Sequence, residues 1–126
     1  NIMPKQNSTL PDGMTWDYFS QIGGWINFYY SSKDADRDKP GTSMVPGPDI
    51  SIDKNAQTIT FTWSGDSFNA PPTVRGTKIY AATYDYDGMT SANRLMSKEV
   101  GEWNFSGGDY ETDPLIIDDI GPIIIP

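Results

Sequence analysis

The sequence predicts an all-β fold, an antiparallel β-sandwich of the immunoglobulin-like or jelly-roll-like type. Aromatic residues make up 13% of the chain, several segments alternate apolar with polar residues, and clusters of turn-forming residues separate those segments. No segment shows a convincing helical period. A chain of 126 residues is long enough for one domain at most, so residues 1–126 are expected to form a single sandwich or the C-terminal part of one.

A hairpin over residues 49–63, "DISIDKNAQTITFTW", gives the clearest strand signal. Polar residues of "DKNAQ" separate two alternating stretches, as expected for a turn between paired strands. The apolar members of the alternation are Ile50, Ile52, Ile59, Phe61 and Trp63. Since they share one side of the hairpin, we predict that this side is buried.

Other strands are predicted on both sides of this hairpin. "MTWDYFSQIG" and "WINFYYSS" form two strands broken at Gly23-Gly24, and "TKIYAATYDYDG" forms another. Shorter strands are expected in "GEWNFSGG", "PLIIDD" and "PIIIP", and the three consecutive isoleucines suit a strand buried on both faces. Residues 1–13 are expected to be an irregular lead-in, and "MTSANRLMSKEV" has room for a single helical turn.

Composition excludes several classes of function. The chain contains neither cysteine nor histidine, which removes disulfides, thiolate chemistry and the histidine-dependent nucleophile systems. A net charge of −8 disfavours nucleic acid and anionic lipid, and it suits divalent cations or neutral polyhydroxyl ligands. No apolar run approaches the roughly 20 residues of a membrane span. The chain begins at Asn1 without a signal-like segment, so we expect a processed or excised piece.

Two acidic motifs are candidates for a structural calcium ion. In "DYDG", Asp85 and Asp87 lie on one face at a strand end, and Gly88 permits a turn around a cation. The alternative is a plain Asp-rich turn. The second motif is "DADRDKPG", with Asp34, Asp36 and Asp38.

The "DADRDKPG" spacing matches only the start of a calcium loop. Lys39 stands where such a loop needs glycine, and no glutamate follows at the twelfth position. A solvated charged loop is therefore the favoured interpretation of Asp34, Asp36 and Asp38. No organic cofactor is predicted.

Aromatic residues offer a way to bind sugars, because a pyranose has an apolar C–H face that stacks on a flat ring. We expect the alternating strands to bury Trp25 and Trp63 in the core. The candidates for ligand contact are Trp16, Tyr84, Trp103 and Tyr110. No acidic residue stands in the apolar setting that would raise its pKa for acid catalysis, so no catalytic residue is predicted.

Several segments together resemble a known module. They are "LPDGMTWDYFSQIGGWINFYY", "DISIDKNAQTITFTWSGDSF", "VRGTKIYAATYDYDG" and "FSGGDYETDPLIIDDIGPIIIP". In order and spacing they resemble the later half of the DOMON-like, carbohydrate-binding-module-like domain found towards the C-terminus of glucodextranase and of some bacterial amylase- and pullulanase-type glycoside hydrolases.

The resemblance has three departures. Tyr84 replaces a tryptophan that usually precedes "DYDG", and Gly23-Gly24-Trp25 replaces a His-Gly-Trp of the family. The first half of the family's module has no counterpart here. Strands without their usual neighbours leave open edges, so the sandwich is expected to be incomplete without a partner segment.

The resemblance implies a non-catalytic module that attaches a secreted, cell-surface or periplasmic glycoside hydrolase or surface protein to α-glucan. Two alternatives remain open. The chain could be a structural or assembly subunit whose sheet another chain completes. It could also be an architectural domain that packs on a catalytic domain and binds no sugar.

Overall fold

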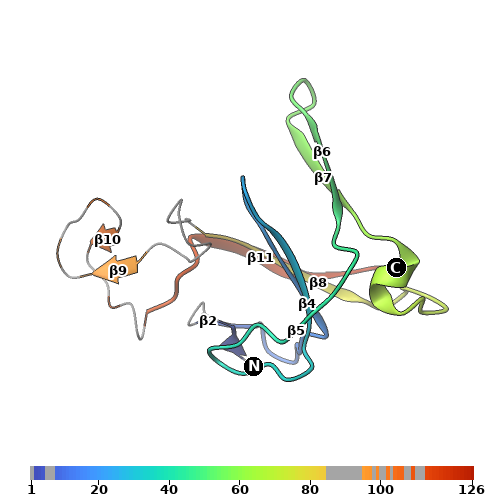
Figure 1. The fold of residues 1–126 in the computed structure, drawn as a ribbon, viewed down its shortest axis with the longest axis horizontal. Coiled ribbons are helices and arrows are strands. Elements are labelled where there is room, and N and C mark those ends of the chain that lie inside the picture. The colour runs from blue at the N-terminus through green and yellow to red at the C-terminus, as the bar shows by residue number, and fades with distance from the viewer. Residues whose placement is uncertain are drawn as a thin grey trace.

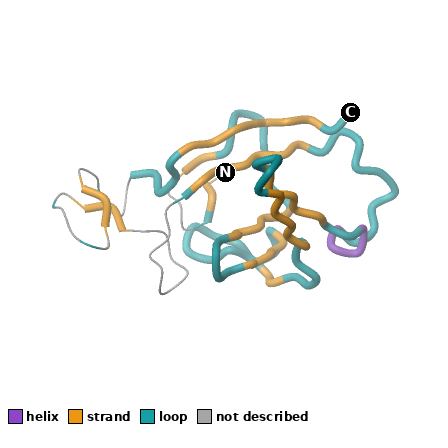
Figure 2. Tube along the Cα trace, turned by 90° about the horizontal axis from the view of Figure 1, so that it is seen from above, coloured by secondary structure: helices purple, strands orange, loops and turns teal. Residues whose placement is uncertain are grey.

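The computed structural model describes most of the chain, and the described part is all-β (Figure 1). The described residues are 2–4, 8–84, 95–97, 99, 102, 104–106, 109 and 113–126. The strands are β1 (Ile2–Met3), β2 (Ser8–Thr9), β3 (Tyr18–Ile22), β4 (Asn27–Ser31), β5 (Thr42–Ser43), β6 (Asp49–Asp53), β7 (Thr58–Thr62), β8 (Lys78–Thr83), β9 (Leu95–Ser97), β10 (Asn104–Ser106) and β11 (Asp118–Ile124). Within these residues the helical structure is a short 3-10 turn, η1 (Gly65–Phe68) (Figure 2).

The strands form small sheets that do not close into a barrel. β3, β4 and β5 make a three-stranded antiparallel sheet in that order, and β1–β2, β6–β7 and β8–β11 are antiparallel pairs. β9 and β10 pair in parallel. The predicted class, an all-β fold of antiparallel sheets consistent with a sandwich, is confirmed.

A small core lies between the segment before β3, β3 itself and β8. Leu10 and Met14 are buried, and Trp16, Phe19 and Tyr80 pack against them. Burial of these side chains holds the β3–β4–β5 sheet and the β8–β11 pair together. Removing apolar surface from water is the main stabilising contribution in a small domain. β3 starts at Tyr18, later than the predicted strand, and Met14 lies before it, where its N–H donates to the Pro11 carbonyl oxygen in a turn.

A second cluster of aromatic residues lies where η1 meets the β3–β4 hairpin. Tyr29 is only 3% exposed and its hydroxyl donates to the carbonyl oxygen of Ser67 at 2.7 Å. The Ser67 hydroxyl in turn donates to the Pro46 carbonyl at 3.1 Å. The rings of Tyr18 and Phe68 contact Tyr29, and Trp63 contacts Phe68. These contacts tie together three segments that are distant in the sequence.

Because of Tyr29, the free energy of unfolding should decrease with rising pH in the alkaline range. Burial and the neighbouring Tyr18 raise the pKa of Tyr29 to about 12, whereas an unfolded tyrosine has a pKa of about 10. Because the folded pKa is the higher one, this contribution is complete below about pH 10 and is lost as the pH rises towards 12. Two pKa units correspond to roughly 3 kcal/mol.

Urea unfolding of the wild type and Tyr29→Phe between pH 8 and pH 12 measures this contribution. The variant loses a hydrogen bond and so about 1 kcal/mol at every pH, but its stability should fall less steeply above pH 10. Ionising groups that do not contact Tyr29 contribute equally to both proteins. Parallel pH profiles would contradict the prediction.

The β6–β7 hairpin follows the predicted register but not the predicted burial. Ile50 pairs with Phe61 and Ile52 with Ile59, and the Asp53 carboxylate accepts two backbone N–H groups in the turn. Figure 1 shows this hairpin extending away from the other strands, and all four apolar side chains are exposed. The prediction of a buried face within this chain is therefore wrong, because no other described sheet covers the hairpin.

The C-terminal segment forms a strand, as predicted, but with different bounds. β11 joins parts of the predicted strands "PLIIDD" and "PIIIP", and it pairs with β8 except at Gly121 and Pro122, where the register shifts. Proline lacks the N–H that a ladder bond needs, which accounts for the interruption. Tyr80 faces the core, whereas the opposite face, with Ile79, Ile120 and Ile123, is exposed.

Other described elements were not predicted. β1 and β2 lie within the lead-in, β5 lies in the charged loop, and β9 lies where a helical turn had room. Within the described part of the chain, no helix has the length and apolar character needed to cross a membrane.

Candidate functional site

The structure describes two of the four aromatic residues predicted to contact ligand. Trp16 is half-buried, packs against the Leu10–Met14 core and meets Phe19 edge-on with ring centroids 6.1 Å apart. Tyr84 is also half-buried, and its hydroxyl donates to the Ile22 carbonyl oxygen at 3.4 Å. Both rings therefore take part in holding the fold and offer only part of their surface to a ligand.

Trp103 and Tyr110 lie outside the residues that the structure describes. The roles predicted for these two residues stay predictions.

Trp25 is exposed to 86%, although the sequence predicted it in the core. The last strand pair of the hairpin is Ile22 with Asn27, so Trp25 belongs to the connecting turn and not to β4. Ile26 takes the buried position instead. The sequence already indicated a break at Gly23-Gly24, but the turn extends further than predicted, through Trp25 and Ile26, so Trp25 lies at the hairpin tip.

A backbone hydrogen bond and the side chain of Tyr84 hold the hairpin tip that carries Trp25. The Gly23 N–H donates to the Ile26 carbonyl oxygen at 2.9 Å. A β-carbon on Gly23 would lie 3.2 Å from Ile26 Cγ1 and 3.3 Å from the Tyr84 hydroxyl oxygen, so glycine allows Tyr84 to approach the tip. A β-carbon on Gly24 would meet nothing within 4 Å. The tip is therefore closely packed on the Tyr84 side and open beside Gly24.

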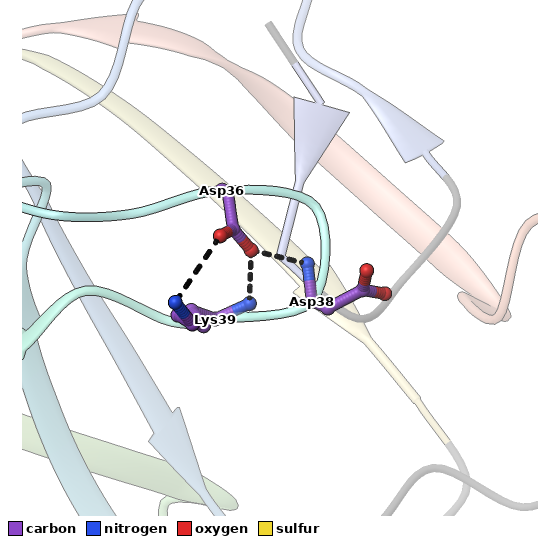
Figure 3. A network of polar contacts seen from close by, with 3 residues as sticks. All are labelled: Asp36, Asp38 and Lys39. Carbon is purple, nitrogen blue, oxygen red and sulfur yellow. Dashed lines mark hydrogen bonds and ion pairs between the residues drawn. The ribbon is translucent and has the colours of Figure 1, made fainter.

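A network of polar contacts organises the loop that contains Asp34, Asp36 and Asp38 (Figure 3). Asp36 Oδ1 accepts the backbone N–H groups of Asp38 and Lys39, both at 2.8 Å, and Asp36 Oδ2 lies 3.7 Å from Lys39 Nζ. Hydrogen bonding from the Asp38 backbone, together with the contacts of Lys39, lowers the pKa of the Asp36 carboxyl. Asp34 accepts a hydrogen bond from the Thr42 hydroxyl at 3.4 Å.

These contacts use the acidic side chains to shape the loop. Across the described ranges, no group of three or more Asp, Glu, His or Cys side chains is arranged to hold a metal ion. The structure thus does not bring Asp34, Asp36 and Asp38 together as a set of ligands. Asp85 and Asp87 lie outside the described residues, and calcium at that motif stays a prediction.

Comparison with known proteins identifies the family. The chain matches the model of the C-terminal binding module, SLH-like, of glucodextranase over residues 2–123. No curated protein and no solved structure matches the sequence significantly. The family is a class of binding module and not of catalytic domain, in agreement with the resemblance noted in the sequence. Because the match spans nearly all of its residues, the chain belongs to the family of C-terminal, SLH-like binding modules of glucodextranase.

Proposed function

We propose that the chain is a non-catalytic module that binds α-glucan and attaches a secreted or cell-surface glycoside hydrolase to its polysaccharide. The observation that carries this proposal is membership of a family of binding modules named for a glucan-degrading enzyme. Fold alone would not support it, since β-sandwiches serve many unrelated functions.

The chemistry of the chain supports a neutral ligand. A net charge of −8 repels phosphate and other polyanions, whereas an uncharged glucan meets no such barrier. The described aromatic residues include an exposed tryptophan, and a flat aromatic ring matches the C–H face of a pyranose. Hydrolysis is not expected, because the family is one of binding modules and the sequence places no acidic residue in the clearly apolar setting that an acid catalyst needs.

Affinity electrophoresis should show that the chain binds glucan. In native gels containing soluble starch, pullulan or dextran, the chain should migrate more slowly than in a gel without polysaccharide, because bound protein is held by the polymer. An unrelated acidic protein of similar size controls for sieving, and a reducing-sugar assay of the same mixtures should stay at background. Unchanged migration in every glucan, with a cooperative melting transition intact, would contradict the proposal.

A second function has its own support in the structure. The outward face of β8–β11 carries exposed isoleucines in an otherwise acidic chain, and apolar sheet faces of this kind normally pack against another layer. This observation favours an architectural or assembly role, in which a second polypeptide covers the sheet. The two functions are compatible, since the exposed tryptophan, Trp25, lies at the tip of the β3–β4 hairpin and not in the β8–β11 sheet.

A further inference from the structure

Trp25 is far more exposed than every other described aromatic residue. Its exposure is 86%, whereas Phe28 and Phe61, the next most exposed aromatic residues among those described, reach only 39%. Within the described part of the chain its indole makes no ring contact or hydrogen bond. A tryptophan ring offers a large, flat, rigid contact area, and tryptophan is accordingly enriched at binding interfaces.

We propose that Trp25 is the platform on which the module stacks a pyranose ring of a neutral polysaccharide. This inference rests on the proposed glucan-binding function and assigns it a site. Trp25 was not among the aromatic residues predicted to contact ligand.

The backbone beneath Trp25 is fixed before any ligand arrives. Ile26 is buried next to it, the Gly23–Ile26 hydrogen bond closes the turn, and the hydroxyl of Tyr84, the residue after β8, contacts the Ile22 carbonyl oxygen. With Ile26 directed inward, the adjacent Trp25 is left on the outside. A ring presented by a rigid hairpin loses less conformational freedom on binding than a ring on a mobile loop.

The surroundings of the ring favour a bulky, uncharged ligand. Residues 22–27, "IGGWIN", carry no charge. The Gly24 side of the tip is open, because a β-carbon added to Gly24 would meet no atom within 4 Å. A sugar ring can therefore approach the indole without desolvating a charged side chain.

The position of the ring also indicates which form of glucan it binds. A protruding tip contacts one face of a sugar and encloses nothing, so each contact is weak. A polymer presents many equivalent rings, and repeated rebinding raises the apparent affinity without any new contact. Long soluble glucan should therefore compete for the module far better than free glucose at the same concentration of sugar units.

Affinity electrophoresis in soluble starch tests the site with the full chain and three variants. Trp25→Ala should reduce the retardation at least tenfold, and Trp25→Phe should keep part of it because a smaller ring remains. Val74→Ala is the matched control, since Val74 is an apolar residue exposed to 50% in the turn before β8, at the opposite end of that strand from Tyr84, which contacts the tip, and it should bind like the wild type. Equal melting temperatures of all four proteins would show that the fold is unchanged.

The outcomes separate the site from the function. If the wild type is retarded and Trp25→Ala is retarded equally, the platform lies elsewhere and only this inference fails. If the wild type is not retarded by any glucan, the proposed function fails as well. If glucose competes as well as starch does, the site encloses a single sugar and the surface-stacking inference is wrong.

Discussion

Gly41→Ala should destabilise the domain by at least about 3 kcal/mol. Gly41 has φ of +102°, a backbone conformation that residues with a side chain rarely adopt. An added β-carbon would also overlap the backbone carbonyl oxygen of Ser31 in the neighbouring strand and lie 3.3 Å from the Lys33 carbonyl oxygen. Both neighbours are main-chain atoms, so relief requires the backbone of β4 or β5 to move.

The affected contacts are the ones that attach β5 to its sheet. Thr42 pairs with Ser31, and the Thr42 N–H donates to the Lys33 carbonyl at 2.9 Å. Moving this backbone would break the pairing and disturb the adjacent Tyr29, whose carbonyl accepts the Met44 N–H. The loss of stability should lower the melting temperature by roughly 10 °C or more.

Gly24→Ala is the matched control for this prediction. Gly24 lies in an exposed turn without a positive φ, and a β-carbon there meets nothing within 4 Å. Its melting temperature should stay close to that of the wild type, as for most surface substitutions. Thermal melts followed by circular dichroism compare the two variants. Equal melting temperatures for Gly41→Ala and the wild type would show that the β4–β5 junction is not constrained as described.

Local patterns predicted the elements whose structure depends on neighbouring residues. The β6–β7 hairpin is the best case, because alternation sets which residues share a face and "DKNAQ" sets the turn. The pairing of Ile52 with Ile59 follows from these two signals alone. Burial of that face did not follow, since it depends on a second layer that no pattern within residues 49–63 specifies.

Residues whose environment is made by distant segments were harder to predict. Continuing the alternation of β4 backwards placed Trp25 in the core, but the turn interrupts the strand before Asn27. The contact that fixes this tip comes from Tyr84, which lies 62 residues from Ile22 in the sequence. The burial of Ser67 likewise depends on Tyr29 and Pro46, which are distant in the sequence. The residues of η1 alone therefore do not indicate that Ser67 is buried.

The loop that contains Asp34, Asp36 and Asp38 shows a different limit of prediction from sequence. The spacing of Asp34, Asp36 and Asp38 is shared by calcium loops and by ordinary turns in which aspartate caps backbone N–H groups. In the structure Asp36 caps Asp38 and Lys39. Spacing alone could not separate these cases, but Lys39 in place of glycine already favoured the turn.

The uncovered face of β8–β11 should make the isolated chain associate. Ile79 pairs with Ile123, and Ile120 pairs with Ala81 on the same face, where Ile120 and Ile123 are exposed to 60% and 50%. Fully burying one isoleucine side chain contributes about 1.5–3 kcal/mol. Covering half-exposed side chains of this kind therefore favours contact with another apolar surface, and in a pure sample that surface belongs to a second copy.

The strand edges favour the same outcome. Among the described residues β8 and β11 form a two-stranded sheet, so each presents an edge that no other described strand pairs. The net charge of −8 opposes association of two copies at low salt, and added salt screens this repulsion. Association should therefore increase with both protein concentration and ionic strength.

Size-exclusion chromatography with light scattering measures this directly on the 126-residue chain. The wild type should show at least twice the monomer mass at high concentration, and Ile120→Lys/Ile123→Lys should return to the monomer mass because lysine cannot be buried there without a partner. Val45→Lys/Val74→Lys is the matched control, since it adds the same charge at two exposed apolar positions outside the face, and it should associate like the wild type. A wild-type chain that stays monomeric at every concentration and salt, and melts cooperatively, would show that the exposed isoleucines need no cover, and the architectural role would lose its support.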